Sequence, residues 1–337
     1  MSPRNTSLIN FLEITFMNKL RAYLQLMRLY GIFIVMMPVL GAIANGIFHH
    51  LFLLLLVGIF ANIFGFIQND YFDIEIDRKS GYVADRPLAS GVISEREAII
   101  LMTSLFFASL LITMLFFSPL SLLFLLLYYL FYTIYNKLSK KFAWMEYSLG
   151  AAATMIFLAG SFSFKNNISF PCLLASFLPL LKYVFNVGIS ANLKDIKYDL
   201  MQGVATTPAV FGVKVDDEIY IPISFIYYAY GIKLLFILIS FLIFLYIPAR
   251  VSILLAISIS IVLIYTIRKI FQNIGNRAQM LFYAEIHEIF TYMMIAAIFY
   301  DYIAIHTNAF LAFALLIIPP VWIVACLKIF FGGRPLE

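Results

Sequence analysis

Charged side chains are scarce in this 337-residue chain. Asp, Glu, Lys and Arg together make up 12% of it, whereas 63% of the residues are hydrophobic and the mean hydropathy is +0.96. A soluble domain carries about 25% charged residues, so the composition excludes a soluble globular protein. The apolar runs are about 20 residues long and lack period-2 alternation, which predicts membrane-spanning helices rather than barrel strands.

Cysteine and histidine are also rare, with two and four residues. Cys172 and Cys326 lie in or beside apolar runs without CxxC spacing, which excludes a disulfide framework and a thiolate metal site. The four histidines have no partners at metal-ligand spacing, and we expect none of them to be catalytic. They are His49, His50, His287 and His306.

The apolar runs predict an all-α fold, a polytopic membrane helical bundle. Ten spans are expected, at about 29–48, 51–68, 98–117, 119–136, 144–163, 172–190, 227–247, 250–270, 281–305 and 309–331. Residues 1–28 are expected to form a cytoplasmic, amphipathic segment at the membrane surface. Residues 29–305 would then form the main transmembrane domain, and 306–337 an additional C-terminal helix with a short tail.

The basic residues predict the orientation of the bundle. If the N-terminus is cytoplasmic, every Lys and Arg except Lys165, Lys233 and Arg250 falls on the cytoplasmic side, as the positive-inside rule requires. Both chain termini are then cytoplasmic. This distribution explains the net charge of +5 without a nucleic-acid partner.

Two acidic clusters follow even-numbered spans, so both are expected at the cytoplasmic face. In the first, Asn69, Asp73 and Asp77 are four residues apart and share one helical face, while Asp70 lies about 100° round the helix. The second cluster contains Asp195 and Asp199. Paired carboxylates at this spacing are usually a solvated helix face, but their repetition at one membrane boundary favours a Mg²⁺ site that holds a polyphosphate.

Basic residues near both clusters could neutralise the remaining phosphate charge. They include Arg86, Lys140 and Lys194. The adjacent membrane interior would accommodate an isoprenoid tail, and the 35 Phe and 21 Tyr residues offer aromatic faces that stabilise a carbocation. Most of these aromatics are nevertheless expected to pack or to face lipid.

The two clusters resemble the signatures of the UbiA superfamily of intramembrane prenyltransferases. The first signature is similar to Asn69–Asp77 with the following RPLASG, and the second to Asp195–Asp199 with Gly203 and Thr206-Thr207-Pro208. A Tyr-then-Lys motif is similar to Tyr135 and Lys140. The resemblance covers about residues 20–305.

The resemblance implies nine helices around a central cavity that opens sideways to lipid, and a tenth helix that lies beyond the usual end of the family. It implies an enzyme that moves a polyprenyl group from its diphosphate to a lipid or aromatic acceptor, with two Mg²⁺ ions. The implied metal ligands are Asn69, Asp70, Asp73, Asp77, Asp195 and Asp199, of which Asp73, Asp77, Asp195 and Asp199 are the expected catalytic residues. The expected diphosphate contacts are Arg28, Arg86, Tyr135, Lys140 and Lys194.

The acceptor remains open at this point. Where the family often has a Gly-Asn pair, this chain has Met145-Glu146, and Gly31 replaces a frequent Asn after Arg28. An archaeal-type ether-lipid precursor and an aromatic quinone precursor are the leading acceptors. A terpene cyclase without a separate acceptor, or a cation-binding transporter, would be the alternative functions.

Overall fold

The computed structural model describes residues 19–331 apart from 80–82, 202 and 217. Most of the expected surface segment, residues 1–18, therefore lies outside the described residues, as does the tail after residue 331.

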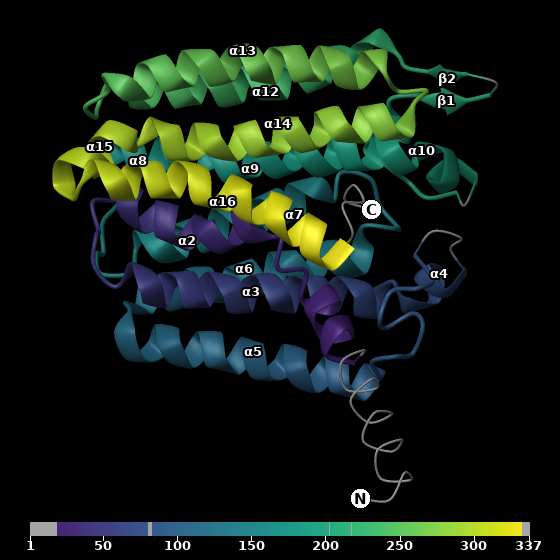
Figure 1. The fold of residues 1–337 in the computed structure, drawn as a ribbon, viewed down its shortest axis with the longest axis horizontal. Helices are drawn as coiled ribbons and strands as arrows, with labels where there is room; N and C mark the ends of the chain where they lie inside the picture. The colour runs from purple at the N-terminus through teal and green to yellow at the C-terminus, as the bar shows by residue number, and fades with distance from the viewer. Residues whose placement is uncertain (1–18, 80–82, 202, 217, 332–337) are drawn as a thin grey trace, which may run out of the picture.

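The described chain is built almost entirely from helices (Figure 1). After a first helical segment, Lys19–Met27, the elements up to the second acidic cluster are α2 (Ile32–Ala44), α3 (Leu51–Phe72), α4 (Ile74–Lys79), α5 (Glu95–Phe116), α6 (Pro119–Leu138), α7 (Glu146–Ser161), α8 (Phe170–Ala175), α9 (Phe177–Phe185), the π-helix η1 (Asn186–Ala191) and α10 (Asn192–Met201). The remaining elements are α11 (Thr207–Val210), β1 (Lys214–Val215), β2 (Ile219–Tyr220), α12 (Ile223–Ile243), α13 (Val251–Gln272), α14 (Arg277–Ile298), α15 (Tyr300–His306) and α16 (Ala309–Phe331).

Eight helical runs in the described chain are long and apolar enough to cross a membrane. One of them, Phe170–Met201, comprises α8, α9, η1 and α10. A ninth span results if Lys19–Met27 and α2, which are bent by 48° at their junction, are taken together. Helix α7 has 16 residues, fewer than the roughly 20 that a bilayer requires. The all-α membrane bundle is thus confirmed, whereas the expected number of ten spans is not.

The long helices lie side by side with α2, α7 and α9 at the centre. Helix α7 packs against α2, α6 and α9, while α5 packs on α3 and α13 packs on α14 at the two edges of the bundle (Figure 1). The central helices approach closely because small residues face one another. A Cβ atom at Gly160 of α7 would lie 1.8 Å from the Pro38 carbonyl oxygen of α2.

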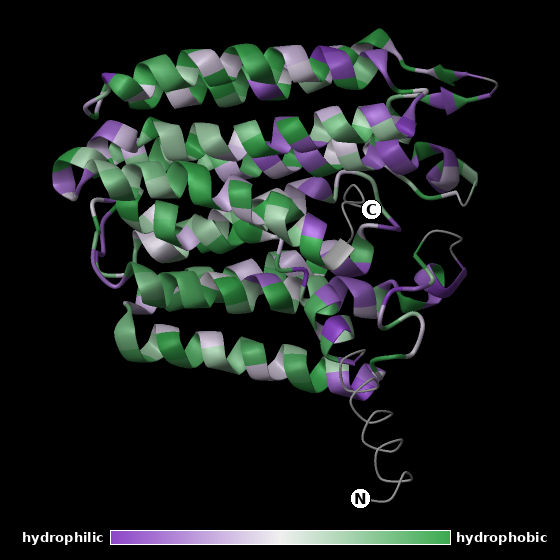
Figure 2. Ribbon diagram, in the orientation of Figure 1, coloured by the Kyte–Doolittle hydropathy of each residue, from purple (hydrophilic) through white to green (hydrophobic). Residues whose placement is uncertain are grey.

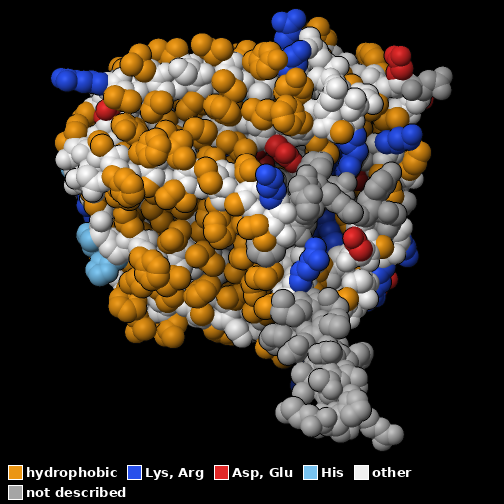
Figure 3. Space-filling view, in the orientation of Figure 1, with side chains coloured by type: hydrophobic (Ala, Val, Ile, Leu, Met, Phe, Trp, Pro, Cys, Tyr) orange, Lys and Arg blue, Asp and Glu red, His pale blue; other side chains and the backbone are white. Residues whose placement is uncertain are grey.

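Polar residues gather at one end of the bundle, where α4, α10 and the β1–β2 hairpin lie (Figure 2). The remaining surface in Figure 3 is largely hydrophobic, and most of its Lys, Arg, Asp and Glu side chains are near the same end. An apolar lateral surface with one charged end is the pattern of a membrane-embedded bundle.

The C-terminal helix α16 lies across the bundle beside α2, α14 and α15. Pro319 and Pro320 lie inside it and cannot donate backbone hydrogen bonds to the preceding turn. Beyond them the Trp322 indole Nε1–H donates to the Leu29 carbonyl oxygen at 2.8 Å. This bond ties the middle of α16 to the segment before α2.

Candidate functional site

A cavity of about 750 Å³ opens at the polar end of the bundle. It is lined by the end of α3, by α4, the α6–α7 loop, η1, α10 and the start of α14, with α2 and α16 on the apolar side. Every predicted site residue except Asp70 lines this cavity. These residues are Arg28, Asn69, Asp73, Asp77, Arg86, Tyr135, Lys140, Lys194, Asp195 and Asp199.

The first acidic cluster follows the end of α3. Asp73 is the residue that ends the helix, yet its amide donates to the Asn69 carbonyl at 3.0 Å and its carbonyl accepts from the Asp77 amide at 2.8 Å. The helical repeat therefore continues through the break into α4, and all three side chains line the cavity.

Asp73 is buried, and no hydrogen bond or ion pair of its carboxylate occurs among the described residues. Burial raises its pKa to about 6, although the nearby Lys140 ammonium acts in the opposite direction. A carboxylate in this environment is stabilised by any cation that binds beside it.

The Asp70 side chain lies outside the cavity wall. Its buried carboxylate accepts a hydrogen bond from the Arg28 guanidinium, with the Arg86 Nη1 at 3.6 Å. Since two guanidinium groups already neutralise it, Asp70 orients these arginines more readily than it binds a metal. Its expected role as a ligand is not favoured by this geometry.

Arg28 adopts a left-handed backbone conformation, with φ of 42°, between Lys19–Met27 and α2. Non-glycine residues rarely adopt this conformation, and strained positions of this kind cluster at functional sites. The turn places its guanidinium between Asp70 and the Phe66 ring, whose centroid lies 5.1 Å from Cζ. No local sequence pattern indicates this strain.

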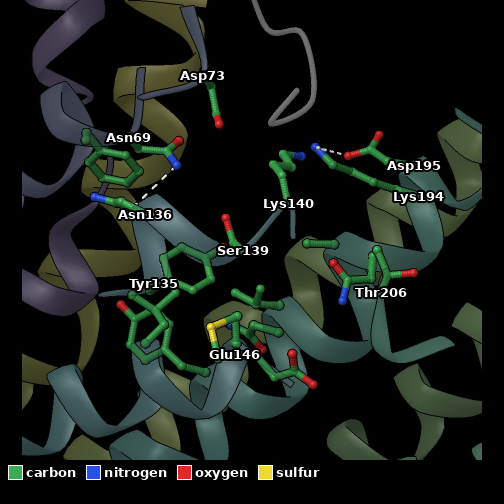
Figure 4. Close-up of a pocket in the computed structure, with 18 of the residues that line it drawn as sticks. Asn69, Asp73, Tyr135, Asn136, Ser139, Lys140, Glu146, Lys194, Asp195 and Thr206 are labelled. Atoms are coloured by element: carbon green, nitrogen blue, oxygen red, sulfur yellow. Dashed lines mark hydrogen bonds and ion pairs between the residues drawn. The ribbon is translucent and has the colours of Figure 1, made fainter. Parts of the chain in front are cut away.

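The second acidic cluster lies on α10, directly after the π-helix η1. Single π-helical turns are rare and occur mostly at functional sites. Lys194 Nζ lies 3.7 Å from Asp195 Oδ2, and an Arg277 nitrogen lies 3.5 Å from Asp195 Oδ1. Figure 4 shows Asp73 and Asp195 on opposite sides of the cavity, with the Lys140 side chain between them.

Lys140 is close enough to both clusters to interact favourably with the charged forms of Asp73 and Asp199. In a site that holds two groups of carboxylates, one central ammonium reduces their mutual repulsion. The Lys140 side chain is therefore placed where an anionic ligand between the clusters would also meet it.

Several residues that line the cavity were not predicted from the sequence. Asn136 receives a hydrogen bond from Asn69 Nδ2 at 3.4 Å and donates to Gln68 Oε1 at 3.0 Å, so it fixes the Asn69 amide (Figure 4). The signal in the sequence that could have identified Asn136 is its position as a polar residue within the apolar helix α6. Glu285 and Glu288 also line the cavity.

Glu288 belongs to a polar group inside the bundle. Lys182 is fully buried, and its Nζ lies 2.9 Å from Glu288 Oε1 and 4.1 Å from the Tyr183 ring centroid. Lys233 is equally buried in α12 and donates to Thr291 Oγ1 at 3.0 Å. His287 contacts the Thr266 hydroxyl at 2.8 Å and does not line the cavity.

The other side of the cavity is apolar. Its wall includes Phe33 and Ile34 of α2 and Ile289 of α14, and Ile323 and Val324 of α16 complete it. The cavity thus joins a charged mouth to a hydrophobic wall within the membrane-spanning part of the bundle. An amphiphile with a charged head and a hydrocarbon tail fits this distribution.

Comparison with known proteins agrees with this arrangement. A family model described as the UbiA prenyltransferase family matches residues 31–283. Over 101 residues the chain is 37% identical to a 4-hydroxybenzoate octaprenyltransferase from Marinomonas sp. (strain MWYL1). That match spans 28% of this chain and 36% of the relative.

Solved structures share the fold at low sequence identity. One is a digeranylgeranylglyceryl phosphate synthase (TM-score 0.64, 23% identity, covering 87% of this chain and 99% of the other). A UbiA homologue from Aeropyrum pernix K1 gives a TM-score of 0.65 at 16% identity, covering 80% and 97%. A homologue from Archaeoglobus fulgidus bound to GPP and Mg²⁺ gives 0.59 at 21%, covering 88% and 99%.

Proposed function

Because this chain belongs to the UbiA prenyltransferase family, we propose that it is a Mg²⁺-dependent membrane enzyme that moves a polyprenyl group from its diphosphate to an acceptor. The observation that carries the proposal is that one cavity joins both acidic clusters, six basic side chains and an apolar wall. A prenyl diphosphate has the matching distribution of charge and hydrocarbon.

The donor set suits Mg²⁺. In the described part of the chain, no group of three or more Asp, Glu, His or Cys side chains could hold a metal by itself. Mg²⁺ is usually bound by one or two carboxylates, with water and substrate phosphates completing the octahedron. We assign one ion to Asp73 and Asp77, with Asn69 beside them, and a second to Asp195 and Asp199. When bound, Mg²⁺ would supply positive charge that makes diphosphate a better leaving group.

The side chains of the protein would act on the two halves of the donor. Arg28, Arg86, Lys140 and Lys194 would neutralise the remaining diphosphate charge, with the Tyr135 hydroxyl as a further hydrogen-bond donor. The apolar wall would hold the tail and exclude water from the allylic carbon. The aromatic faces of Tyr132 and Tyr183, which also line the cavity, would stabilise positive charge that develops there.

The acceptor we propose carries a hydroxyl group and is either a glyceryl ether-lipid precursor or an aromatic quinone precursor. A curated relative named for 4-hydroxybenzoate and a fold neighbour named for a glyceryl phosphate product motivate these two classes.

The test is an incubation of purified protein with Mg²⁺, radiolabelled geranylgeranyl diphosphate and a panel of hydroxyl-bearing acceptors. Diphosphate release and lipid products are followed together. Mg²⁺-dependent transfer supports the proposal, and release with a cyclic hydrocarbon as the product would favour a terpene cyclase. Folded protein that releases no diphosphate would overturn the proposed activity and leave a transporter as the alternative.

We further propose that the charged end faces the cytoplasm. Cys172 and Cys326 are both buried, so the native thiols give little background in a labelling experiment. Glu218→Cys in the β1–β2 hairpin should react with a membrane-impermeant maleimide only after cells are opened. Asn166→Cys, exposed at the other end, should react in intact cells. The reverse pattern would invert the topology.

A further inference from the structure

The geometry points to Glu146 as the residue that receives the acceptor: we propose that its carboxylate binds a neutral hydroxyl group in the cavity, accepts its proton during transfer and excludes acceptors that carry a carboxylate at that end. This inference rests on the proposed prenyl transfer and names the class of acceptor.

Glu146 is held at the cavity wall by a specific network. It is the first residue of α7, it is 3% exposed, and it lines the cavity. Its Oε1 accepts a hydrogen bond from the Thr207 hydroxyl, whose oxygen in turn accepts from the Trp144 amide at 3.4 Å. Trp144 has a left-handed φ of 68°. A strained turn and a buried hydroxyl thus fix one carboxylate.

The neighbouring helix leaves room for this side chain. A Cβ atom at Gly188 in η1 would lie 2.7 Å from Glu146 Oε1 and 2.9 Å from its Cδ. Any larger residue at position 188 would displace the carboxylate. The close contact between η1 and α7 therefore requires glycine at position 188 if the Glu146 carboxylate is to keep its place.

Glu146 differs in its charge environment from the carboxylates of the two acidic clusters. Within the described part of the chain, Asp73 and Asp199 lack an ion pair as well, but both interact favourably with the Lys140 ammonium. Asp77, Asp195 and Glu288 each lie within 4 Å of a basic nitrogen. No lysine or arginine among the described residues forms an ion pair with Glu146. A buried carboxylate without a cation repels a second anion and attracts a hydrogen-bond donor.

The position of Glu146 in the cavity suits contact with the acceptor rather than with the diphosphate of the donor. Figure 4 places Glu146 at the opposite end of the view from Asp73, with Ser139 and Tyr135 between them. Tyr135 lies within electrostatic range of both Asp73 and Glu146. The cavity therefore has a diphosphate end beside Asp73 and a second polar end beside Glu146.

The transfer step can be written in full for this arrangement. The C–O bond between the allylic carbon and the diphosphate breaks, and the diphosphate leaves with the electron pair. A lone pair of the acceptor hydroxyl forms the new C–O bond, and the hydroxyl proton passes to the Glu146 carboxylate, then to water. An aliphatic hydroxyl satisfies this balance. In an aromatic acceptor that is prenylated at a ring carbon, the new bond is C–C and the proton lost comes from that carbon, while the carboxylate binds the phenolic hydroxyl. Neither route needs an oxidant or a reductant.

The test compares the wild-type protein with Glu146→Gln, using Mg²⁺ and geranylgeranyl diphosphate as the donor. The acceptor probes are 4-hydroxybenzoate, its methyl ester and a long-chain O-alkylglycerol. The wild type should prefer the neutral probes to 4-hydroxybenzoate. Gln accepts the Thr207 hydrogen bond but takes up no proton, so Glu146→Gln should lower kcat for the neutral probes by about 100-fold. The KM for the donor should stay unchanged. The ratio of kcat/KM for the methyl ester to kcat/KM for 4-hydroxybenzoate should become smaller than in the wild type.

Two further variants separate this role from a structural one. Thr207→Val removes the hydroxyl that fixes Glu146 but keeps the carboxylate, and should lower kcat by about tenfold or less, the worth of one hydrogen bond. Glu218→Gln, an exposed carboxylate in the hairpin, is the matched control and should behave as the wild type.

Full transfer activity in Glu146→Gln, with its selectivity unchanged, would overturn the inference and leave Glu146 as a packing residue. So would a wild-type preference for 4-hydroxybenzoate over its ester, or diphosphate release without transfer to any hydroxyl probe. A wild type that releases no diphosphate fails at the earlier step and overturns the proposed function together with this inference.

Discussion

The Arg86 guanidinium Nη1 lies 2.8 Å from the Asp77 carboxylate Oδ2, and both side chains line the cavity. The ion pair joins a residue expected to bind diphosphate to one expected to bind metal. In the proposed enzyme the two groups would exchange partners when the donor binds. Arg86 would then contact a phosphate oxygen, and Asp77 would be free to hold Mg²⁺.

Replacing Arg86 with Gln should weaken donor binding. A hydrogen bond to a charged group contributes about 1.5–3 kcal/mol, so the KM for the prenyl diphosphate should rise by roughly 10- to 100-fold. The KM for the acceptor should stay the same. Steady-state kinetics with each substrate varied in turn measures both. Arg78→Gln is the matched control, because Arg78 is exposed and does not line the cavity. An effect confined to the acceptor would contradict the assignment.

Asp73→Asn and Asp195→Asn should each abolish turnover while the protein remains folded. These carboxylates hold metal in the proposed enzyme, and Asn keeps their volume but not their charge. Thermal unfolding without Mg²⁺ should be unchanged for Asp195→Asn and unchanged or raised for Asp73→Asn, since Asp73 is buried without an ion pair. Near-normal activity in either variant would refute the two-metal assignment.

Lys140→Gln should change the affinities for metal and donor in opposite directions. The ammonium repels a cation between the acidic clusters but attracts a diphosphate. Mn²⁺ alone should therefore bind the variant more tightly, whereas donor affinity should fall by about tenfold, the loss of one charge-assisted contact. Titration calorimetry measures both. Lys141→Gln, at an exposed position outside the cavity wall, should show neither change. A parallel loss of both affinities would point to a structural role.

Ile323→Trp in α16 should shorten the longest donor tail that the enzyme accepts. Ile323 is buried and lines the apolar wall, so a larger side chain takes volume from the tail. Overpacking costs about 1–3 kcal/mol, so kcat/KM for a 20-carbon donor should fall by about tenfold and that for a 10-carbon donor much less. Val321→Trp, whose side chain is exposed and outside the wall, is the matched control. Equal losses for both donors would place the tail elsewhere.

The stability that the Lys182–Glu288 ion pair contributes should depend on both partners, of which Lys182 is buried and Glu288 partly exposed. Lys182 is fully buried, so Glu288→Gln leaves an ammonium without its carboxylate and should reduce the free energy of unfolding by about 3 kcal/mol. Lys182→Met/Glu288→Leu should recover most of this loss. Denaturation of the single and double variants in detergent forms a complete cycle. A double variant as unstable as the sum of the single variants would contradict the coupling.

The sequence by itself determined the membrane bundle and most of the charged residues of the cavity. Long apolar runs leave only helices or closed barrels as spanning structures, so the fold class followed from composition. The i, i+4 spacing of Asp73 and Asp77, and of Asp195 and Asp199, likewise specified one face of a helix, because this geometry is local. The predicted number of ten spans is not confirmed, since α7 with 16 residues is shorter than its apolar run.

Only the tertiary structure decided which side chains meet across the cavity. Asp70 is one residue from Asn69 yet faces Arg28 and Arg86, a pairing that depends on the strained turn at Arg28. Glu146 meets Thr207, 61 residues away, and Trp322 meets Leu29, 293 residues away. Contacts at such separations depend on how whole helices pack. Packing is set jointly by many residues, such as Gly160 against Pro38, and no local spacing records it.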